Sequence, residues 1–268
     1  MEAIIRRRSV RNYNAKALSE EHKTKLLQYI QDENNLTGPF GSKIRIVYKE
    51  VSNANKREKL GTYGFIKNAP AYLISVCQNT KESMLDLGFV FEKLVLFLQG
   101  NGLNTCWVGG TFHRKKLQLE QKFSSDEFIP VISPVGYSAN SQHFVERIVR
   151  KGAKSDTRKN FDELFFNSDF NTKIIDPSTR ELFEYLRLAP SASNKQPWRV
   201  VLSDNKIAHF FIERTPKYGN SLGYDIQLVD MGIALSHYLI VSGNKHVYIE
   251  NPQIEPLNEN SSYVFSVK

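Results

Sequence analysis

The chain has 268 residues, of which 41% are hydrophobic and 12% aromatic, which excludes an intrinsically disordered chain and allows two small α/β units or one large one. The formal net charge of +8 favours anionic partners such as phosphates, nucleotides or nucleic acids, without choosing among them. The two cysteines, Cys77 and Cys106, lie in apolar segments without metal-site or redox spacing, so we expect reduced core residues and a cytoplasmic protein. The arginines at residues 6–8 precede no apolar signal core, and the longest apolar run is too short to cross a membrane.

The first half of the chain is predicted to alternate helices and strands. Its elements in chain order are an amphipathic helix capped by Ser19, a strand at 44–48, a long helix at roughly 83–99, a helix stop at 100–102 and two further apolar segments at 105–110 and 130–137. The long helix is apolar on most of its faces, which indicates a central position in the core.

The second half follows a polar stretch, residues 152–160, which we interpret as the connection between the halves. Its elements in chain order are a helix with Ser178 as N-cap and Glu181 as capping-box partner, a loop at 188–198, a strand at 199–202, a long apolar helix from residue 229 and a final strand at 263–267. Because strands alternate with helices throughout, the expected fold class is α+β, with a mixed sheet flanked by helices.

Two matched pairs of segments predict an internal repeat. Residues 26–30 (Leu-Leu-Gln-Tyr-Ile) resemble 182–186 (Leu-Phe-Glu-Tyr-Leu), and residues 85–89 (Leu-Asp-Leu-Gly-Phe) match 229–233 (Val-Asp-Met-Gly-Ile). The two pairs occur in the same order and at similar spacing, which indicates duplication. We therefore expect two tandem half-repeats, at 1–155 and 156–268, of which the second is shorter.

Two segments carry residue types suited to binding a ligand. Residues 4–13 hold four arginines and Ser9, and guanidinium groups bind phosphate oxygens in bidentate fashion, although a solvated basic terminus explains the same pattern. Residues 188–198 form a loop between a helix and a strand, where small residues permit close backbone approach and Asn194 offers donors and an acceptor to a polar ring edge. An ordinary polar loop anchored by Trp198 explains this second segment as well.

Together, Arg7-Arg8-Ser9-Val10-Arg11 and residues 190–198 (Pro-Ser-Ala-Ser-Asn-Lys-Gln-Pro-Trp) closely resemble the two signatures of the nitroreductase family. Residues 102–110 resemble its third recurring region and Gly136-Tyr137 a later strand end, so the resemblance covers most of the chain. In that family the usual enzyme is a homodimer, in which the Arg-Ser segment of one subunit and the Pro-Ser-x-x-Asn loop of the other meet at each of two FMN sites.

This chain departs from the family pattern because each half keeps only one motif. The first half reads Leu-Thr-Gly-Pro-Phe-Gly-Ser at residues 36–42, where the Pro-Ser-x-x-Asn loop is expected. The second half reads Asn-Thr-Lys-Ile-Ile-Asp at residues 171–176, where the Arg-Ser segment is expected. The simplest inference is an intramolecular pseudo-dimer, monomeric or paired again as a homodimer, with one intact and one degenerate FMN site.

The resemblance implies FMN-binding roles for residues of the first half and the connection. Arg7 and Ser9 would hold the FMN phosphate, and Arg8 would lie beside the flavin mainly through its backbone. Arg11 would lie near the pyrimidine edge, where a cation stabilises the negative charge that reduction leaves near N1. Arg158, ahead of Lys154 and Lys159, is the candidate for a further basic residue on the phosphate.

The remaining implied contacts come from backbone and small side chains. Residues that would line the flavin are Pro190, Ser191, Ala192 and Asn194, and those that would present backbone to its ring are Gly109 and Gly110. No catalytic side chain is expected, since the cofactor carries the chemistry.

The implied activity is hydride transfer from NADH or NADPH to FMN, and then electron transfer to a nitroaromatic, quinone or similar planar acceptor, by a ping-pong mechanism at one flavin face. A non-catalytic flavin-binding, storage or sensing protein is the alternative. A nucleic-acid-binding protein ranks last, because the basic residues are scattered over the chain. Neither a metal site nor a Rossmann nicotinamide domain is expected, since His-x-x-x-His and Gly-x-Gly-x-x-Gly spacings are absent.

Overall fold

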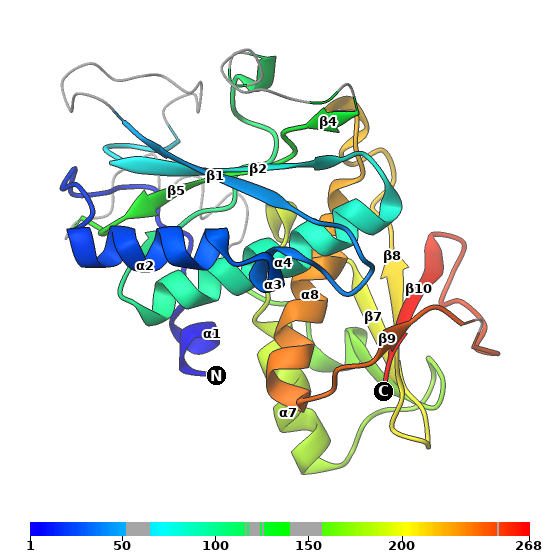
Figure 1. Ribbon diagram of the computed structural model, residues 1–268. Helices are drawn as coiled ribbons and strands as arrows, with labels where there is room; N and C mark the ends of the chain where they lie inside the picture. The colour runs from blue at the N-terminus through cyan, green and yellow to red at the C-terminus, as the bar shows by residue number, and fades with distance from the viewer. Residues whose placement is uncertain (52–64, 116, 118–123, 125, 140–156, 251) are drawn as a thin grey trace.

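The computed structural model describes residues 1–51, 65–115, 117, 124, 126–139, 157–250 and 252–268. Within this part, each half of the chain contributes one five-stranded sheet, and two long helices lie between the sheets (Figure 1). The α+β class, with sheets flanked by helices, is therefore confirmed.

The first half builds an antiparallel sheet around a central strand that is buried except at its last residue. Its elements are α1 (Glu2–Arg6), α2 (Glu20–Gln31), α3 (Glu33–Leu36), β1 (Arg45–Glu50), β2 (Ala71–Gln78), α4 (Lys81–Gly100), β3 (Asn104–Thr105), β4 (Glu127–Phe128) and β5 (Ile132–Gly136). The strand order is β1-β2-β5-β3, with β4 pairing with the end of β2. The Ser19 side chain accepts the His22 N–H and begins α2 where predicted. Strand β2 is buried on both faces, which explains why it is apolar along nearly its whole length.

The second half builds a mixed sheet in the order β6-β7-β8-β10-β9, with β6 parallel to β7 and the other pairs antiparallel. Its elements are β6 (Phe165–Asn167), α7 (Pro177–Arg187), β7 (Trp198–Leu202), β8 (Ala208–Glu213), α8 (Ile226–Ser242), β9 (Val247–Tyr248) and β10 (Ser261–Val267), with 3₁₀ turns at Phe161–Glu163, Ala192–Asn194 and Asn220–Leu222.

The predicted N-cap of α7 was wrong by two residues. Asp176, not Ser178, caps this helix, and its carboxylate accepts the Thr179 N–H at 2.8 Å. The reason is Pro177: its fixed φ and missing N–H suit the first helical position, so the residue before it becomes the N-cap.

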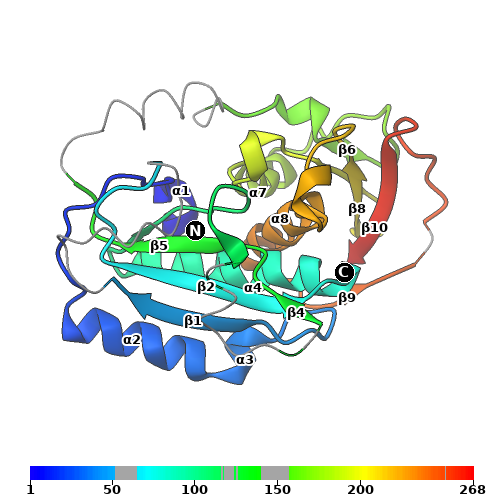
Figure 2. The same ribbon diagram turned by 90° about the horizontal axis from the view of Figure 1, so that it is seen from above.

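Helices α4 and α8 cross in close contact at the centre of the molecule (Figure 2). A Cβ atom on Gly88 would lie 2.0 Å from the Val229 carbonyl oxygen, and one on Gly232 would lie 1.9 Å from the Leu85 carbonyl oxygen. These are matched positions of the two similar segments at 85–89 and 229–233. The contacts are therefore reciprocal, as they are across a two-fold axis.

The structure also bears on the cysteines, on membrane-spanning helices and on the boundary between the halves. Cys77 and Cys106 are both buried, as predicted, and no disulfide joins them. No helix among the described residues is both long and apolar enough to cross a membrane. The predicted boundary between the half-repeats, at 155/156, falls within residues 140–156, which are outside the described part of the chain. Lys154 lies in the same range.

Candidate functional site

A pocket opens where the two halves of the chain meet. Its empty space is about 750 Å³, including the opening to solvent. The predicted binding residues that line it are Arg7, Ser9, Arg11, Gly109, Arg158, Pro190, Ser191, Ala192 and Asn194. Arg8 and Gly110 are not among the lining residues.

The N-terminal segment after α1 is held extended by its backbone. Ser9 forms a bridge with Thr105, and the Val10 N–H donates to the Thr105 carbonyl at 2.9 Å. At the next residue, the Arg11 carbonyl accepts the Lys67 N–H at 2.8 Å. These contacts fix the segment between β3 and the residues that precede β2.

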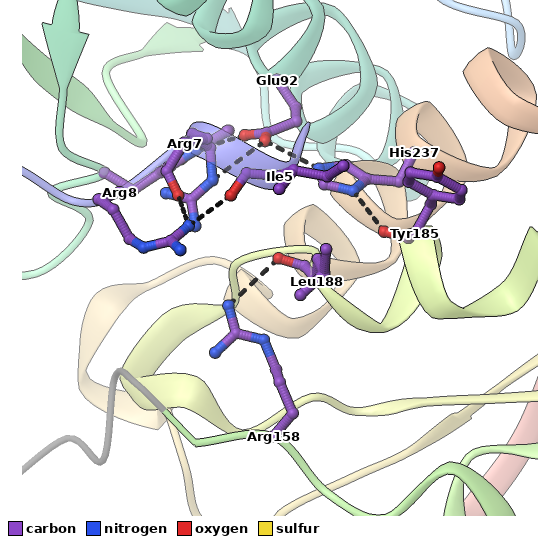
Figure 3. A network of polar contacts seen from close by, with 9 residues as sticks. Ile5, Arg7, Arg8, Glu92, Arg158, Tyr185, Leu188 and His237 are labelled. Carbon is purple, nitrogen blue, oxygen red and sulfur yellow. Dashed lines mark hydrogen bonds and ion pairs between the residues drawn. The ribbon is translucent and has the colours of Figure 1, made fainter. Parts of the chain in front are cut away.

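An extended chain directs alternate side chains to opposite sides. Accordingly Arg7, Ser9 and Arg11 face the pocket, whereas Arg8 is exposed. The Arg8 guanidinium donates instead to the carbonyls of Ile5 and Arg7, at 2.7 and 2.8 Å (Figure 3). The alternation explains how an Arg-rich stretch delivers two of its arginines and one serine to a single site.

The loop before β7 has an unusual backbone. Ser193, Asn194 and Gln196 have φ values of 47°, 55° and 49°, although none of them is glycine. Such conformations cost on the order of 1 kcal/mol or more each, and they persist where surrounding contacts hold them. One such contact is the Gln196 N–H, which donates to the Ser191 hydroxyl at 2.9 Å. The loop is therefore a fixed part of the pocket wall.

Asn194 and Arg158 tie this loop to the residues that precede the second sheet. The Asn194 amide donates to the Thr157 carbonyl at 3.0 Å, and its oxygen lies 3.4 Å from the Arg158 guanidinium. Arg158 also donates to the Leu188 carbonyl at 3.2 Å, and it points toward the N-terminal segment of the other half (Figure 3). Asn194 thus has a role inside the protein besides the contact with a ligand that the sequence predicts.

The glycine at position 109 is explained by packing between the halves. A Cβ atom on Gly109 would lie 2.8 Å from Ile226 and 3.0 Å from the Tyr224 hydroxyl, and one on Gly110 would lie 3.2 Å from Leu222. The Tyr224 hydroxyl also donates to the Gly109 carbonyl at 3.0 Å. A side chain at either position would therefore collide with residues of the second half. From the sequence, the need for glycine was expected to come from a flavin ring.

The comparison with family models decides the family. The model of a family described as "Putative TM nitroreductase" matches residues 1–242. The chain belongs to this family. The resemblance to nitroreductases inferred from the sequence is thereby confirmed, and family membership supports an oxidoreductase as the general class.

One solved structure shares the fold of this nitroreductase-family chain over nearly its whole length, and others are similar to part of it. A putative nitroreductase from Thermotoga maritima is 21% identical, with a TM-score of 0.59 over 99% of this chain and 91% of that one. A nitroreductase with bound FMN from Bacteroides fragilis is 18% identical, with a TM-score of 0.41 over 53% of this chain and 90% of that one. A putative NADH oxidase from Clostridium acetobutylicum is 22% identical, with a TM-score of 0.40 over 52% and 89%. No curated protein matches the chain.

Seven of the residues that line the pocket of this family member were not predicted from the sequence. These are Trp107, Val131, Ser193, Ile226, Val229, Asp230 and Ile233. Four of them occupy one face of α8 at helical spacing, so a signal was present in the sequence. Apolar spacing identifies a buried helix face, but it does not distinguish a face in the core from one in a pocket.

The polar groups of the pocket leave hydrogen-bonding capacity for a ligand. Arg7 is only 6% exposed, and its Nε atom and the Nη1 atom of Arg11 are buried without a hydrogen-bond partner among the described residues. Burial lowers the pKa of Arg7, although the nearby Glu92 opposes this shift. Burial also raises the pKa of Asp230 well above its ordinary value. Buried guanidinium donors of this kind fit a phosphate or another anion.

Within the residues that the structure describes, no group of three or more His, Cys, Asp or Glu side chains is arranged to hold a metal ion.

Proposed function

We propose that the protein is an FMN-dependent oxidoreductase that holds one FMN in the pocket between its halves. The observation that carries the proposal is the meeting of the two family motifs. Arg7, Ser9 and Arg11 come from the first half and Ser191 and Asn194 from the second, and all five line one pocket. The bound FMN of the Bacteroides fragilis nitroreductase is consistent with this cofactor.

The proposed roles follow from the chemistry of each group. The guanidinium groups of Arg7 and Arg158 and the Ser9 hydroxyl would bind the phosphate, for which charge-assisted hydrogen bonds are strong. Arg11 would lie near the pyrimidine edge of the ring, where its charge stabilises the reduced form. The backbone of Gly109 and the residues Pro190, Ser191, Ala192 and Asn194 would line the ring and exclude water. When bound, FMN supplies the capacity to accept a hydride and to pass electrons on.

The electron donor in this proposal is NADH or NADPH, and the acceptor is a nitroaromatic, a quinone or a similar planar molecule. Both would use the same exposed face of the cofactor in turn, which predicts ping-pong kinetics. The protein would supply orientation, a dry environment and positive charge, and no acid or base from its side chains.

We further propose that the halves, 1–155 and 156–268, are repeats that form an intramolecular pseudo-dimer. The reciprocal contacts of Gly88 and Gly232 support it, because a duplicated helix pair crossing on a two-fold axis requires small residues at both matched positions. The pseudo-dimer is complete within one chain, whether the chain remains monomeric or pairs again.

The first experiment is an absorbance spectrum of the purified protein after addition of FMN, followed by anaerobic NADH or NADPH. We expect flavin bands that either nucleotide bleaches and that a quinone restores. Bands that resist both nucleotides would instead indicate a flavin-binding protein without this electron donor, and the absence of bound FMN would contradict the proposal.

A matched pair of variants tests whether this pocket is the site. Arg158→Ala removes a guanidinium that lines the pocket, whereas Arg8→Ala removes one that is exposed and bonded to local carbonyls. Losing a charge-assisted contact of about 1.5–3 kcal/mol predicts FMN affinity at least about tenfold lower for Arg158→Ala. Arg8→Ala should bind FMN like the wild type. Equal losses in both variants would place the cofactor elsewhere.

A further inference from the structure

One carboxyl group on the wall of the pocket is only partly used by the protein. Asp230 of α8 lines the pocket and is only 2% exposed. One of its carboxyl oxygens, Oδ1, accepts the Ala192 N–H at 2.8 Å. The other, Oδ2, is buried without a hydrogen-bond partner among the described residues. Because burying an unpaired polar atom is costly, this oxygen calls for a partner from outside the protein.

Two tyrosines, Tyr218 and Tyr224, lie close enough to Asp230 for its charge to act on their hydroxyl groups. Both hydroxyl groups are bonded elsewhere. That of Tyr224 donates to the Gly109 carbonyl at 3.0 Å, and that of Tyr218 bonds the Ser193 hydroxyl at 2.9 Å. Neither tyrosine therefore satisfies the free oxygen of Asp230.

Two buried carboxyl groups of α4, by contrast, have partners for both oxygens. One oxygen of Glu92 accepts the indole N–H of Trp107 at 2.8 Å. The other lies 3.0 Å from the Nε2 atom of His237 (Figure 3). Asp86, at the position that matches Asp230 in the similar segments, accepts two backbone N–H groups. The free oxygen thus distinguishes the carboxyl group that lines the pocket from two that are bonded within the protein.

The surroundings of Asp230 on its own helix are apolar. The other residues of α8 that line the pocket are Ile226, Val229 and Ile233. Together with Asp230 they follow the spacing of one helix face. An apolar face that holds a single polar group suits a ligand that is planar and apolar on its face and polar at its edge.

We propose that Asp230 binds the ligand of this pocket directly, through a hydrogen bond between its free oxygen and a polar atom on the edge of a planar ring. The inference rests on the proposed function, and it adds a side chain of α8 to the residues assigned there to the cofactor. The bond would give the pocket a means of selecting a ring by the atom at its edge.

The direction of this hydrogen bond follows from the protonation of the carboxyl group. Burial raises the pKa of Asp230 well above its ordinary value, and the charge of Asp225 adds to this shift, despite the hydrogen bond from Ala192. The neutral acid is therefore favoured. Since Oδ1 accepts the Ala192 N–H, the hydrogen of the acid lies on Oδ2 and is donated. The matching atom of the ligand is an acceptor, either a ring carbonyl oxygen or a ring nitrogen.

Two substitutions separate the hydrogen bond from the shape of the side chain. Asp230→Asn keeps a donor, because its amide oxygen accepts the Ala192 N–H and its NH₂ group then takes the place of Oδ2. Asp230→Leu has a similar shape and no donor. Dissociation constants for FMN and for riboflavin, which lacks the phosphate, are measured by flavin fluorescence. The thermal shift produced by inorganic phosphate reports on the other end of the ligand, and Arg158→Ala is the matched control.

Asp230→Leu should bind FMN and riboflavin at least about fivefold more weakly, because an acceptor on the ring loses its donor. Asp230→Asn should bind both flavins like the wild type, and inorganic phosphate should stabilise all three proteins alike. Arg158→Ala should show the reverse pattern, in which FMN and phosphate bind more weakly and riboflavin binding is unchanged. A structural effect of Asp230→Leu on the whole pocket would weaken phosphate binding as well.

Infrared difference spectra give a readout that does not require Asp230→Leu to fold. A protonated carboxyl group has a C=O stretching band that is separate from the bands of carboxylates. Addition of flavin to the wild type should shift such a band, since the group then donates a hydrogen bond. The shifted band should be absent from the same difference spectrum of Asp230→Asn.

Other outcomes would overturn the inference. If Asp230→Leu binds both flavins like the wild type, if Asp230→Asn is weakened as much as Asp230→Leu, or if no carboxyl band responds to flavin, Asp230 is not the donor, and the proposed function stands. If the wild type binds neither flavin but binds adenosine monophosphate, with the predicted order of variants, the proposed function fails and the inference stands. If none of these ring compounds binds, both fail.

Discussion

At the scale of single residues, Asp86 and Asp230 show how matched positions acquire different roles. They occupy the same place in the similar segments at 85–89 and 229–233. Both oxygens of Asp86 accept backbone N–H groups, from Phe40 at 3.0 Å and from Ser42 at 2.7 Å. Asp230 accepts only the Ala192 N–H, at 2.8 Å, and its second oxygen is buried without a hydrogen-bond partner among the described residues. That oxygen belongs to a pocket residue and remains available to a ligand.

Replacing Asp230 by Asn is predicted to stabilise the ligand-free protein at neutral pH. Burial raises the folded-state pKa of this carboxyl well above its ordinary value, so the folded protein binds the proton more tightly than the unfolded chain does. Stability therefore falls as the pH rises from the unfolded pKa, about 3.9, through the folded pKa. Asp230→Asn removes this dependence while its amide oxygen still accepts the Ala192 N–H. Melting temperatures measured against pH should show a flatter curve for the variant.

Asp86→Asn serves as the matched control for that prediction. An amide can satisfy only one of the two N–H donors that Asp86 now bonds, and its NH₂ group would face the other. Leaving a buried donor unsatisfied costs about 1–3 kcal/mol, so this variant should lose stability at neutral pH. If both Asn variants lowered the stability of the protein equally, the prediction would be wrong, because the different hydrogen bonding of the two carboxyl groups would not affect stability.

At the scale of elements, the crossing of α4 and α8 depends on two glycines. Gly88→Ala or Gly232→Ala would place a Cβ atom about 2 Å from a backbone carbonyl oxygen of the opposite helix, which side-chain rotation cannot relieve. Overpacking of this kind costs about 1–3 kcal/mol or more, measurable as a lower urea midpoint. The double variant should cost less than the sum of the single ones, because one separation of the helices accommodates both methyl groups.

Gly100→Ala is the control for the helix crossing. Gly100 ends α4, and a Cβ atom there would have no neighbour within 4 Å. Alanine is more favourable than glycine in a helix by up to about 1 kcal/mol, so this variant should be neutral or slightly more stable. A similar loss of stability in all three alanine variants would point to a general effect on helix α4 or α8 rather than to their contact.

Local chemistry made many of the elements predictable. Ser19 marks the start of α2, and the apolar periodicity of α4 marks a central helix, because caps and periodicity depend on neighbours in sequence. The pocket-facing side chains of the N-terminal segment could be named because they belong to a motif. Glu92 and His237 could not, since they lie 145 positions apart and only the helix crossing brings them together. The role of Asn194 in holding its own loop likewise depends on the folded backbone.

At the scale of the whole molecule, the two halves of the chain contribute different segments to the pocket. The second half lines the pocket with its loop at 190–194. In the first half, the loop at 36–42 instead donates backbone N–H groups to Asp86. A Cβ atom on Gly38 would lie 2.0 Å from that carboxylate, and the Phe40 ring packs against Phe265 of β10. The first loop is therefore committed to contacts within the protein, and its half contributes Arg7, Ser9 and Arg11 to the pocket instead.

This asymmetry predicts one FMN for each polypeptide chain, whatever the oligomeric state. Titration of the flavin-free protein, followed by flavin absorbance after removal of unbound FMN, should saturate at a single equivalent. Arg158→Glu places a negative charge at the phosphate end of the proposed site, where it repels the ligand. In a chain with one site, this variant should lose all bound flavin under conditions that saturate the wild type. A chain with two working sites would saturate at two equivalents and retain half of them in the variant, because the substitution changes the pocket that Arg158 lines.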